Sequence, residues 1–455
     1  MNRVVKIKNI AVLNRKNIKK DSFPTIIKYL DTGSLTKNKI ESFQLLNSEK
    51  DKIPSRAQRK VSINTILYST VRPNQEHFGI IERDFKDIVA STGFTTIDIL
   101  DTNVSPKFIY YLLTQNYITD YLHTIGMNAV SSYPSISPND IGNLKFNIPD
   151  LFTQKSIVKT LSDLDTKIEL NNKINQELEA MAKTFYDYWF VQFDFPDANG
   201  KPYKSSGGKI VYNEELKREI PDGWGSNTIS EWIANDKSGD WGKEQVEGNY
   251  TKKVSCIRGA DINGLNGKGE VKAPERYILE KNAHKILEVG DFIIEISGGS
   301  PTQSTGRMAF ITEETLERFE HPLICSNFCK AVTLKEKHML FNFVYEWNRI
   351  YDSGVLFGWE GKTSGIKNFL FESFVTNYKI VQPQKELMEL FYEKAKPVHA
   401  QIQKNLQQNQ KLAELRDWLL PMLMNGQVTV GKAYDKSDLE LGMVAEEQES
   451  YNEEN

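Results

Sequence analysis

Apolar residues recur in alternating steps of four and three along residues 157–185, the spacing that keeps one seam of a helix against a partner helix. Two asparagines interrupt this seam, and the same pattern returns 234 residues later with both asparagines in register. Only Arg416 breaks the match, so the pattern predicts two similar halves joined by two long helices. The seam positions are Ile157, Leu161, Leu164, Ile168, Asn171, Asn175, Leu178, Ala182 and Phe185, then Phe391, Ala395, Val398, Ile402, Asn405, Asn409, Leu412, Arg416 and Leu419.

The segment before each long helix has its own recurring order of elements. Short apolar runs at residues 65–71 and 97–100 predict strands, and residues 107–122 have helical spacing. The turn-rich loop Gly126–Asn139 corresponds in position to Gly354–Asn368. The two halves share little identity outside the helices, so we expect two similar frames that carry different surface loops.

These patterns predict an α+β fold with two globular domains, connected by two long antiparallel helices that form a coiled coil, as a pseudo-twofold internal repeat. The expected boundaries are a first globular domain at 1–150, a central spacer helix at 151–192, a linker rich in Gly, Pro and Ser at 193–220, a second globular domain at 221–383, a distal spacer helix at 384–425 and an acidic, disordered tail at 426–455.

Composition narrows the class of protein. A chain of 455 residues is too long to fold around one ordinary hydrophobic core, which suggests two or more domains. It has no apolar run of membrane-spanning length, and its first ten residues lack the hydrophobic stretch of a signal peptide. Its three cysteines give no disulfide framework. We therefore expect a cytoplasmic protein with no membrane contact.

The distribution of charge favours an anionic partner more than the net charge of -3 does. Residues 1–60 carry 15 Lys and Arg against 5 Asp and Glu, whereas the tail from Lys432 onward contains 8 acidic residues. A tail of this composition stays disordered and masks a basic body. A solvated basic surface on an ordinary domain is the alternative explanation.

No constellation of catalytic residues is evident. A phosphate-binding loop ending at Gly361-Lys362-Thr363 would need a glycine where Leu356 stands. Asp261 with Glu270 and Lys272 fits the acidic pattern of metal nucleases only loosely, and a solvated loop explains it better. His321, Cys325 and Cys329 lack a fourth zinc ligand, so core cysteines are the better account. We expect no catalysis and no metal site in this chain.

Several stretches resemble the specificity subunit of type I restriction–modification systems. They are LSDLDTKIELNNKINQELEAMAKTFYDYWFVQFDF, GKPYKSSGGKIVYNEEL with REIPDGW, KTSGIKNF and LRDWLLPMLMNGQV. The resemblance covers nearly the whole chain. Two features depart from the family pattern: the first domain lacks an entry like Pro221–Trp224, and the tail after Val430 has no assigned role.

The resemblance implies a non-catalytic subunit in which each globular domain is a target recognition domain that reads one half of a split double-stranded DNA sequence. It implies two methyltransferase subunits on the outer surfaces of the helices and a motor–nuclease subunit as further partners. No cofactor is expected on this chain, because S-adenosylmethionine would be bound by the methyltransferase subunits.

Reading the major groove needs Arg or Lys for guanine and Asn or Gln for adenine, with phosphate contacts from Lys, Ser or Thr nearby. For any single candidate, an exposed polar loop residue remains the alternative. The candidates are Arg56, Arg59, Lys60, Arg72, Asn74 and Gln75 in the first domain, and Gln303, Arg307, Lys362, Thr363, Ser364, Lys367 and Asn368 in the second.

The helix pair yields a prediction of register. Pairing amide with amide in an antiparallel arrangement sets Asn171 against Asn409 and Asn175 against Asn405, with residues at the solvent edge as the alternative. Trp189, Phe190 and Trp418 lie beside the ends of the seams. They are candidate partner-binding anchors, or simply packing residues at the helix termini.

Two other functions stay open from the sequence. A structural scaffold with a coiled-coil core and no DNA specificity would also show the heptads, but basic loops at matching places in both halves argue against it. A self-sufficient restriction enzyme would need methyltransferase and nuclease motifs, which we do not find in the sequence.

Overall fold

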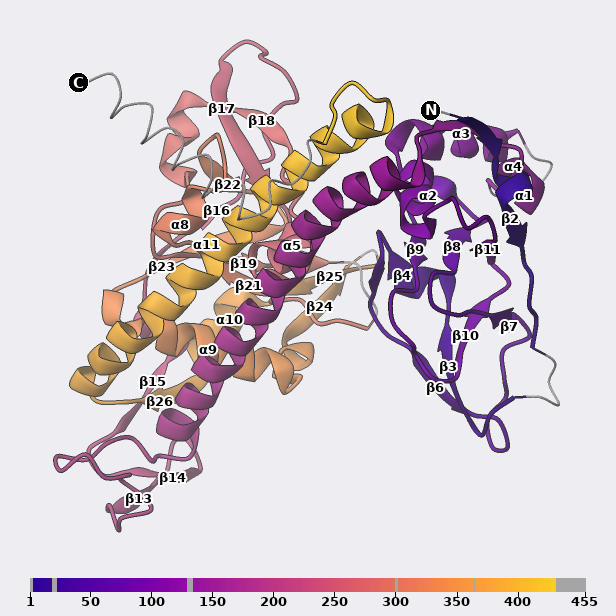
Figure 1. Ribbon diagram of the computed structural model, residues 1–455. Coiled ribbons are helices and arrows are strands. Elements are labelled where there is room, and N and C mark those ends of the chain that lie inside the picture. Colours follow the sequence, from indigo (N-terminus) through magenta and orange to yellow (C-terminus); the bar gives the residue numbers. More distant parts are fainter. Residues whose placement is uncertain (1–2, 19–22, 129–133, 299–301, 364, 431–455) are drawn as a thin grey trace, which may run out of the picture. The chain divides into compact units, whose positions relative to one another are not determined.

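The computed structural model describes residues 3–18, 23–128, 134–298, 302–363 and 365–430 (Figure 1). The fold divides into two compact units. Unit 1 comprises Met1–Thr166 with Ala413–Asn455, and unit 2 comprises Lys167–Leu412. Each unit therefore contains one globular domain together with portions of both long helices. The long helices are α5 (Leu151–Tyr186) and α11 (Lys385–Met424).

Unit 1 is a mixed α+β domain with its strands in several small sheets. The sheet orders are β2-β11-β8-β9, β6-β3-β10-β7, β1-β12 and β4-β5, and β3 pairs with β10 in parallel. The elements are β1 (Arg3–Lys6), α1 (Ile7–Ile10), β2 (Ala11–Leu13), β3 (Ile26–Leu30), β4 (Leu35–Thr36), β5 (Lys39–Ile40), β6 (Gln44–Asn47), β7 (Ala57–Lys60), β8 (Ile66–Ser69), β9 (Phe78–Ile80), β10 (Ile88–Ser91), β11 (Phe94–Ile99), α2 (Pro106–Leu113), α3 (Asn116–Met127), α4 (Pro138–Gly142) and β12 (Lys145–Ile148).

Unit 2 has the same organisation. Its sheet orders are β16-β23-β19-β21, β18-β17-β22, β15-β26, β20-β25-β24 and β13-β14, and β17 pairs with β22 in parallel. The elements are β13 (Ile210–Asn213), β14 (Arg218–Pro221), β15 (Gly225–Thr228), α6 (Ile229–Trp232), β16 (Ile233–Ser238), β17 (Tyr250–Ile257), α7 (Ile262–Leu265), β18 (Glu275–Leu279), β19 (Asp291–Glu295), β20 (Ser297–Gly298), β21 (Met308–Phe310), α8 (Glu313–Leu316), β22 (Leu323–Cys325), β23 (Cys329–Leu334), α9 (Leu340–Asp352), β24 (Glu360–Thr363), β25 (Ile366–Phe369), α10 (Phe371–Asn377) and β26 (Lys379–Gln382).

The two units are topological repeats of each other. The sheet β2-β11-β8-β9 corresponds strand by strand to β16-β23-β19-β21, and the parallel pair β3 and β10 corresponds to β17 and β22. Helices α2 and α9 begin at 106 and 340, strands β12 and β26 at 145 and 379, and helices α5 and α11 at 151 and 385, a constant offset of 234. The repeat seen in the sequence is thus a repeat of fold.

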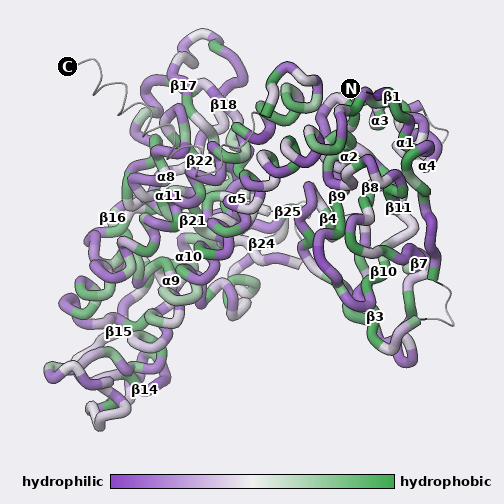
Figure 2. The backbone as a smooth tube through the Cα atoms, in the orientation of Figure 1, coloured by the Kyte–Doolittle hydropathy of each residue, from purple (hydrophilic) through white to green (hydrophobic). Residues whose placement is uncertain are grey.

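Both long helices are buried along one face only. Hydrophobic and hydrophilic stretches alternate along them in Figure 2, as expected for helices that pack on one side and face water on the other. The start of α5 is capped by Asp150, whose carboxylate accepts a hydrogen bond from the Thr153 backbone amide at 3.0 Å. Pro149 precedes this cap, so the helix begins where the preceding strand must end.

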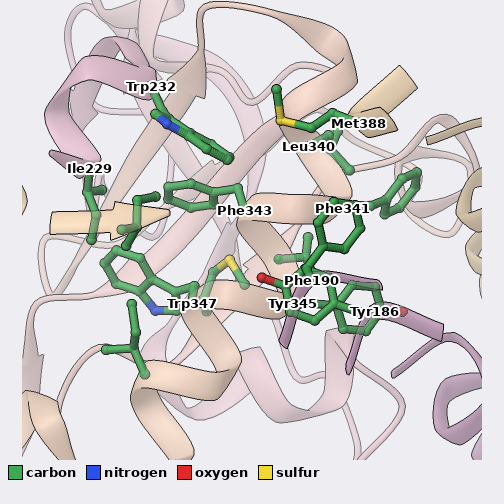
Figure 3. Close-up of a cluster of buried hydrophobic side chains, with 14 of the residues drawn as sticks. Tyr186, Phe190, Ile229, Trp232, Leu340, Phe341, Phe343, Tyr345, Trp347 and Met388 are labelled. Atoms are coloured by element: carbon green, nitrogen blue, oxygen red, sulfur yellow. The ribbon is translucent and has the colours of Figure 1, made fainter. Parts of the chain in front are cut away.

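The largest core lies in unit 2 and is rich in aromatic side chains. Figure 3 shows Tyr186, the last residue of α5, and Phe190, in the π-helical turn Asp187–Val191 that follows it, beside Phe341 and Tyr345 of α9. The ring centroids of Tyr186 and Tyr345 lie 5.3 Å apart in a stacked arrangement. In unit 1, Leu423 and Met424 at the end of α11 join the core of that unit. The end of one long helix therefore completes the core of each unit.

Two sequence predictions differ from the structure, and a third falls mainly on residues that the structure does not describe. Residues 107–122 form two helices, because α2 ends at Leu113 and the chain restarts at Asn116. The segment predicted as a linker at 193–220 contains the hairpin β13–β14, and its Phe193 and Phe195 pack against Trp224. The predicted tail, 426–455, lies outside the described residues from 431 onward.

Candidate nucleic-acid interface

In unit 1, three of the predicted reading residues lie together on the loop between β8 and β9. Arg72, Asn74 and Gln75 are all exposed, with the last two on a single 3₁₀ turn. Arg72 has a positive φ of 47°, and its backbone amide donates to Pro134 O at 2.9 Å. The loop that follows α3 therefore holds the base of this tip, which makes the tip a fixed platform for polar side chains.

The second predicted set in unit 1 is carried by β7 and the residue before it. Arg56 and Lys60 are exposed, whereas Arg59 is half-buried and donates from Nη1 to Asn17 Oδ1 at 2.8 Å. Burial lowers the pKa of the Arg59 guanidinium, which still carries its charge at neutral pH. Arg59 is therefore partly committed to the fold, and Arg56 and Lys60 are the more accessible cations.

The turn between β10 and β11 connects these two sets in unit 1. The Thr92 amide donates to Arg56 O at 2.8 Å, and the Thr70 amide donates to Gly93 O at 2.8 Å. Adjacent residues of one turn thus bind the backbone at the start of β7 and at the start of the β8–β9 loop. The structure brings the two predicted sets to one edge of unit 1.

In unit 2, the predicted residues fall on the β19–β21 loop and on the hairpin β24–β25. Gln303 is exposed on the loop, whereas Lys367 and Asn368 lie on β25. Short strand β20 of the loop pairs with β25, with Ser297 opposite Asn368. The Ser297 hydroxyl donates to Asn368 Oδ1 at 2.7 Å, so this amide helps hold the loop to the hairpin.

Two predicted cations of unit 2 are engaged within the protein. Arg307 donates from Nε and Nη2 to the two carboxylate oxygens of Glu295 at 2.8 and 2.7 Å. Lys367 Nζ lies 3.2 Å from Glu360 Oε2, donates to Gln303 O at 3.1 Å and sits over the ring of Phe357. The side chains of Arg307 and Lys367 are only 18% and 14% exposed. The structure therefore does not show Arg307 and Lys367 as free side chains available to contact bases.

The remaining predicted residues of unit 2 lie at the tip of the hairpin. Lys362 and Thr363 belong to strand β24 by their backbone, and Ser364 lies outside the described residues. Their role in DNA contact stays a prediction.

The two units use corresponding loops. In unit 1 the β8–β9 loop bridges the loop after α3, through Val71 and Ser135. In unit 2 the β19–β21 loop pairs with the hairpin after α9 through β20 and β25. The Ile136 amide donates to Thr70 O at 2.9 Å, and the Phe369 amide donates to Ile296 O at 2.8 Å. The same backbone junction thus presents polar residues in both units.

Sequence reasoning missed two kinds of residue at this junction. Phe328, on the turn between β22 and β23, is 55% exposed, whereas its repeat equivalent Phe94 is fully buried. Glu295 and Glu360 are buried carboxylates beneath the loop and the hairpin. A glutamate that ends the apolar run of β19 was the available signal for a buried ion pair, because an unpaired carboxylate is not buried there.

The asparagine layers bring α5 and α11 together in unit 2. Asn171 Nδ2 donates to Asn409 Oδ1 at 2.9 Å, and Asn405 Nδ2 donates to Asn175 Oδ1 at 2.7 Å. Higher residue numbers on α5 pair with lower ones on α11, so the helices are antiparallel. These are the amide pairs expected from the sequence repeat.

The aromatic residues predicted as partner anchors have different surroundings. Trp189 and Phe190 are only 4% and 5% exposed and belong to the core of unit 2. Packing explains these two side chains, and the prediction of a partner contact is corrected for them. Trp418 in unit 1 is 54% exposed and keeps its place as a candidate anchor.

The candidates for other chemistry have structural roles. Asp261 accepts from the Arg258 side chain and from the Lys272 amide, so its carboxylate is a local cap. Cys325 and Cys329 are buried, and burial raises the pKa of the Cys329 thiol to about 12. Within the described ranges there is no group of His, Cys, Asp and Glu residues that could hold a metal ion.

No helix in the described part of the chain has the length and apolarity needed to cross a membrane.

Comparisons with known proteins agree with this architecture. Residues 2–180 match the family described as the type I restriction modification DNA specificity domain. The chain is 25% identical over 445 residues to the HindI specificity subunit of Haemophilus influenzae, covering 90% of this chain and 95% of that one. It is 25% identical over 377 residues to the MjaIX specificity subunit of Methanocaldococcus jannaschii, covering 80% and 78%.

A solved structure is similar in fold. The crystal structure of the type I restriction–modification system S subunit from M. genitalium superposes with a TM-score of 0.50 at 14% identity, covering 93% of this chain and 96% of that one. Both curated relatives are named as specificity subunits of type I restriction enzymes. The resemblance seen in the sequence is confirmed: the chain is similar in sequence to specificity subunits of type I restriction enzymes and similar in fold to a type I restriction–modification S subunit.

Proposed function

We propose that this chain gives sequence specificity to a type I restriction–modification complex by binding a bipartite DNA target. Unit 1 reads one half through the β8–β9 loop and β7, and unit 2 reads the other half through the β19–β21 loop and its hairpin. The observation that carries the proposal is the repeat: corresponding loops of two similar folds present polar side chains at the same junction. A coiled-coil scaffold without DNA specificity would not need this junction in either unit.

Affinity in such a complex would come from cations along the loops. The exposed cations Arg56, Lys60 and Arg72 in unit 1 suit contacts with phosphates or with guanine. Asn74, Gln75 and Gln303 supply amides, which pair in a bidentate manner with adenine. The loops thus carry the side-chain types needed for both positioning and reading.

Binding of the complete chain to duplexes with randomised positions tests the proposal. We expect enrichment of two short sequences separated by unread base pairs, with affinity that falls steeply as salt is raised. Uniform binding of all duplexes, or no binding, would instead favour the scaffold function.

The same proposal assigns partners to the outer helix surfaces. Met181 and Phe185 on α5, and Tyr188 in the π-helical turn Asp187–Val191 that continues it, are 50%, 43% and 39% exposed and follow the spacing of one helix face. Leu415, the repeat equivalent of Met181, and Trp418 are 43% and 54% exposed on α11. One exposed apolar position, Met181 and Leu415, recurs between the helices, and exposed aromatic side chains lie near it on each. This suits two copies of one partner, the methyltransferase subunit that carries S-adenosylmethionine, while a motor–nuclease subunit completes the assembly.

Co-expression tests this assignment. Replacing Trp418 with Glu should weaken recovery of the methyltransferase subunit with the tagged chain, since a charge would be buried in an apolar contact. Replacing the exposed Lys155 with Glu provides a matched control on α5. Full recovery with both variants would place the partner elsewhere.

A further inference from the structure

Two buried glutamates lie under the candidate reading loops of unit 2. Glu295 ends β19 and Glu360 begins β24, with side chains that are 7% and 6% exposed. A carboxylate buried to this degree persists only when it is paired and hydrogen-bonded. The partners of these two residues therefore indicate what the local structure depends on.

Glu295 is paired with Arg307 in a bidentate manner. The hydrogen bonds from Arg307 to this carboxylate raise the pKa of the guanidinium above its ordinary value. The contact uses the Nε and Nη2 edge of the guanidinium, and the Arg307 side chain as a whole is only 18% exposed. A movement of Arg307 toward DNA that broke this contact would leave the buried Glu295 carboxylate uncompensated.

Glu360 connects the loop to the hairpin. It accepts from the Thr305 amide and hydroxyl at 2.7 and 3.2 Å, and it is paired with Lys367. Lys367 in turn donates to Gln303 O. One carboxylate and one cation thus fix the backbone on both sides of Ser304.

The core holds the rest of this loop. Trp347 Nε1 donates to Gly306 O at 2.8 Å, and the Tyr351 hydroxyl donates to Ser304 O at 3.3 Å. Gly306 has a φ of 95°, and a Cβ there would lie 2.4 Å from Leu356 Cδ1. The loop from 302 to 306 is therefore built into one conformation.

We propose that Arg307 and Lys367 are positioning residues, whose ion pairs with Glu295 and Glu360 fix the loop of unit 2 in the shape that reads DNA, without either cation contacting a base or a phosphate. The proposal rests on the proposed function and deepens it. Discrimination at this half of the target depends on the shape that these pairs impose. In unit 1, by contrast, the exposed Arg72 has no ion-pair partner among the described residues, which suits direct contact.

The test compares removal of a cation with removal of only its carboxylate partner. The full-length chain is assayed with randomised duplexes as wild type and as Glu295→Gln, Glu360→Gln, Arg307→Ala and Arg307→Lys. Glu215→Gln, which loses an exposed ion pair with Lys379, is the matched control. Two quantities are measured: the base preference at each position of the target, and the slope of log affinity against log salt.

If Arg307 and Lys367 position the loop, both Glu→Gln variants lower the preference for the half read by unit 2 about tenfold or more, as Arg307→Ala does. The preference for the other half stays unchanged, and so does the salt slope, because no phosphate contact is lost. Arg307→Lys keeps the charge but not the bidentate geometry, so it also loses preference. The Glu215→Gln control behaves like wild type.

Other outcomes would overturn the assignment. A direct reader predicts that Arg307→Ala erases preference at one base pair while Glu295→Gln preserves it. A phosphate contact predicts a salt slope smaller by about 0.9 for Arg307→Ala at unchanged preference. A wild-type chain without any sequence preference would instead overturn the proposed function itself, and this role with it. Should Arg307→Ala not fold, Arg307→Lys with Glu295→Gln gives the same contrast.

Discussion

Arg72 occupies a position where the backbone and the side chain serve different purposes. Its positive φ and its amide bond to Pro134 O hold the base of the loop, while the guanidinium faces solvent. A side-chain truncation there removes the guanidinium and leaves the backbone contact in place. Arg72 therefore offers a clean test of modular reading.

We expect Arg72→Ala to weaken recognition of only the half-sequence read by unit 1. A lost base contact should cost about 1–3 kcal/mol of discrimination at one position. Lys145→Ala, which removes an exposed cation from β12, should change no base preference. Target selection from randomised duplexes measures both variants. Equal effects of Arg72→Ala on both halves would show that the units do not read independently.

His399 on α11 has an environment that opposes its charge. It stacks on Phe341 with ring centroids 4.7 Å apart, and its Nε2 lies 2.7 Å from the Tyr345 hydroxyl. Burial lowers the pKa of this imidazole from 6.5 to about 4. The folded state therefore holds a neutral histidine throughout the range in which an unfolded chain takes up a proton.

The pKa of His399 is lower in the folded protein than in the unfolded chain. The folded state therefore has its full stability above pH 6.5 and loses part of it as the pH falls toward 4. The loss should reach about 3 kcal/mol in the free energy of unfolding. His399→Gln should flatten this dependence relative to wild type. Urea unfolding at pH 7.5, 6, 5 and 4 measures both proteins. Parallel curves for the two would mean that His399 titrates normally in the fold.

Single residues also show where sequence reasoning stops. Arg307 and Lys367 are of the residue types that read DNA, and nothing in the neighbouring sequence reveals that Glu295 and Glu360 already bind them. The partner Glu295 reaches Arg307 only because β19 and β21 are antiparallel neighbours. An ion pair formed by sheet pairing requires the topology, which the sequence pattern does not contain.

At the scale of elements, the heptad pattern predicted which residues of the long helices are buried, in addition to where the helices lie. Ile157, Leu161, Asn171, Asn175 and Ala182 are all buried on α5, as the seam requires. Phe185 is instead 43% exposed, and the next residue, Tyr186, is buried. A straight helix drifts by ~20° per heptad against a repeat of seven, so the inward face moves along the sequence toward the helix end.

The break in the second seam has a structural reason as well. Arg416 replaces the apolar residue expected there, and its Nη1 donates to Asp165 Oδ1 at 2.9 Å. Burial alone would lower the pKa of Arg416, but the hydrogen bond and charge of Asp165 raise it overall. The sequence showed that Arg416 breaks the seam, but its ion pair with Asp165 could be predicted only from the register of the two helices.

The paired amides give a prediction for the helix interface. In Asn175→Ala the buried Asn405 amide loses its acceptor, and we expect a loss of about 1–3 kcal/mol in the free energy of unfolding. The double variant Asn175→Leu, Asn405→Leu removes both polar groups, so it should regain that stability or exceed it. Urea midpoints measure the three proteins. A double variant less stable than Asn175→Ala would mean that the two amides stabilise the fold by more than the hydrogen bond between them.

At the scale of the molecule, the constant offset of 234 was visible in the sequence, and it located α5 and α11 in advance. Strands β12 and β26 follow the same offset in the structure. The offset fails upstream, since β2 begins at 11 and β16 at 233, with longer connections in unit 2. Loops absorb such insertions at little cost, because each doubling of loop length costs only about 0.6 kcal/mol. The parts of the site that differ between the units lie on these loops. The repeat therefore predicted where the loops lie in the sequence, but not which residues their side chains contact.

A spacer made of two helices makes the gap in the target adjustable. Helix α5 has 36 residues and α11 has 40, and each residue adds roughly 1.5 Å of rise. Inserting one heptad at the asparagine level of both helices preserves the seam and lengthens the spacer by about 10 Å. Under the proposed function, the unread gap should then grow by about three base pairs at ~3.4 Å each.

The two half-sequences should remain as they were, because no loop is altered. Affinity should fall, since three base pairs also turn one half-site about a quarter turn around the duplex, given 10–10.5 base pairs per turn. Selection of randomised duplexes by the insertion variant measures the gap, and a heptad inserted in α5 alone is the control that should destroy the pairing. A folded variant that selects the original gap would show that the helices do not set the spacing. A gap longer by three base pairs would show that the length of the helix pair sets the distance between the two half-sequences.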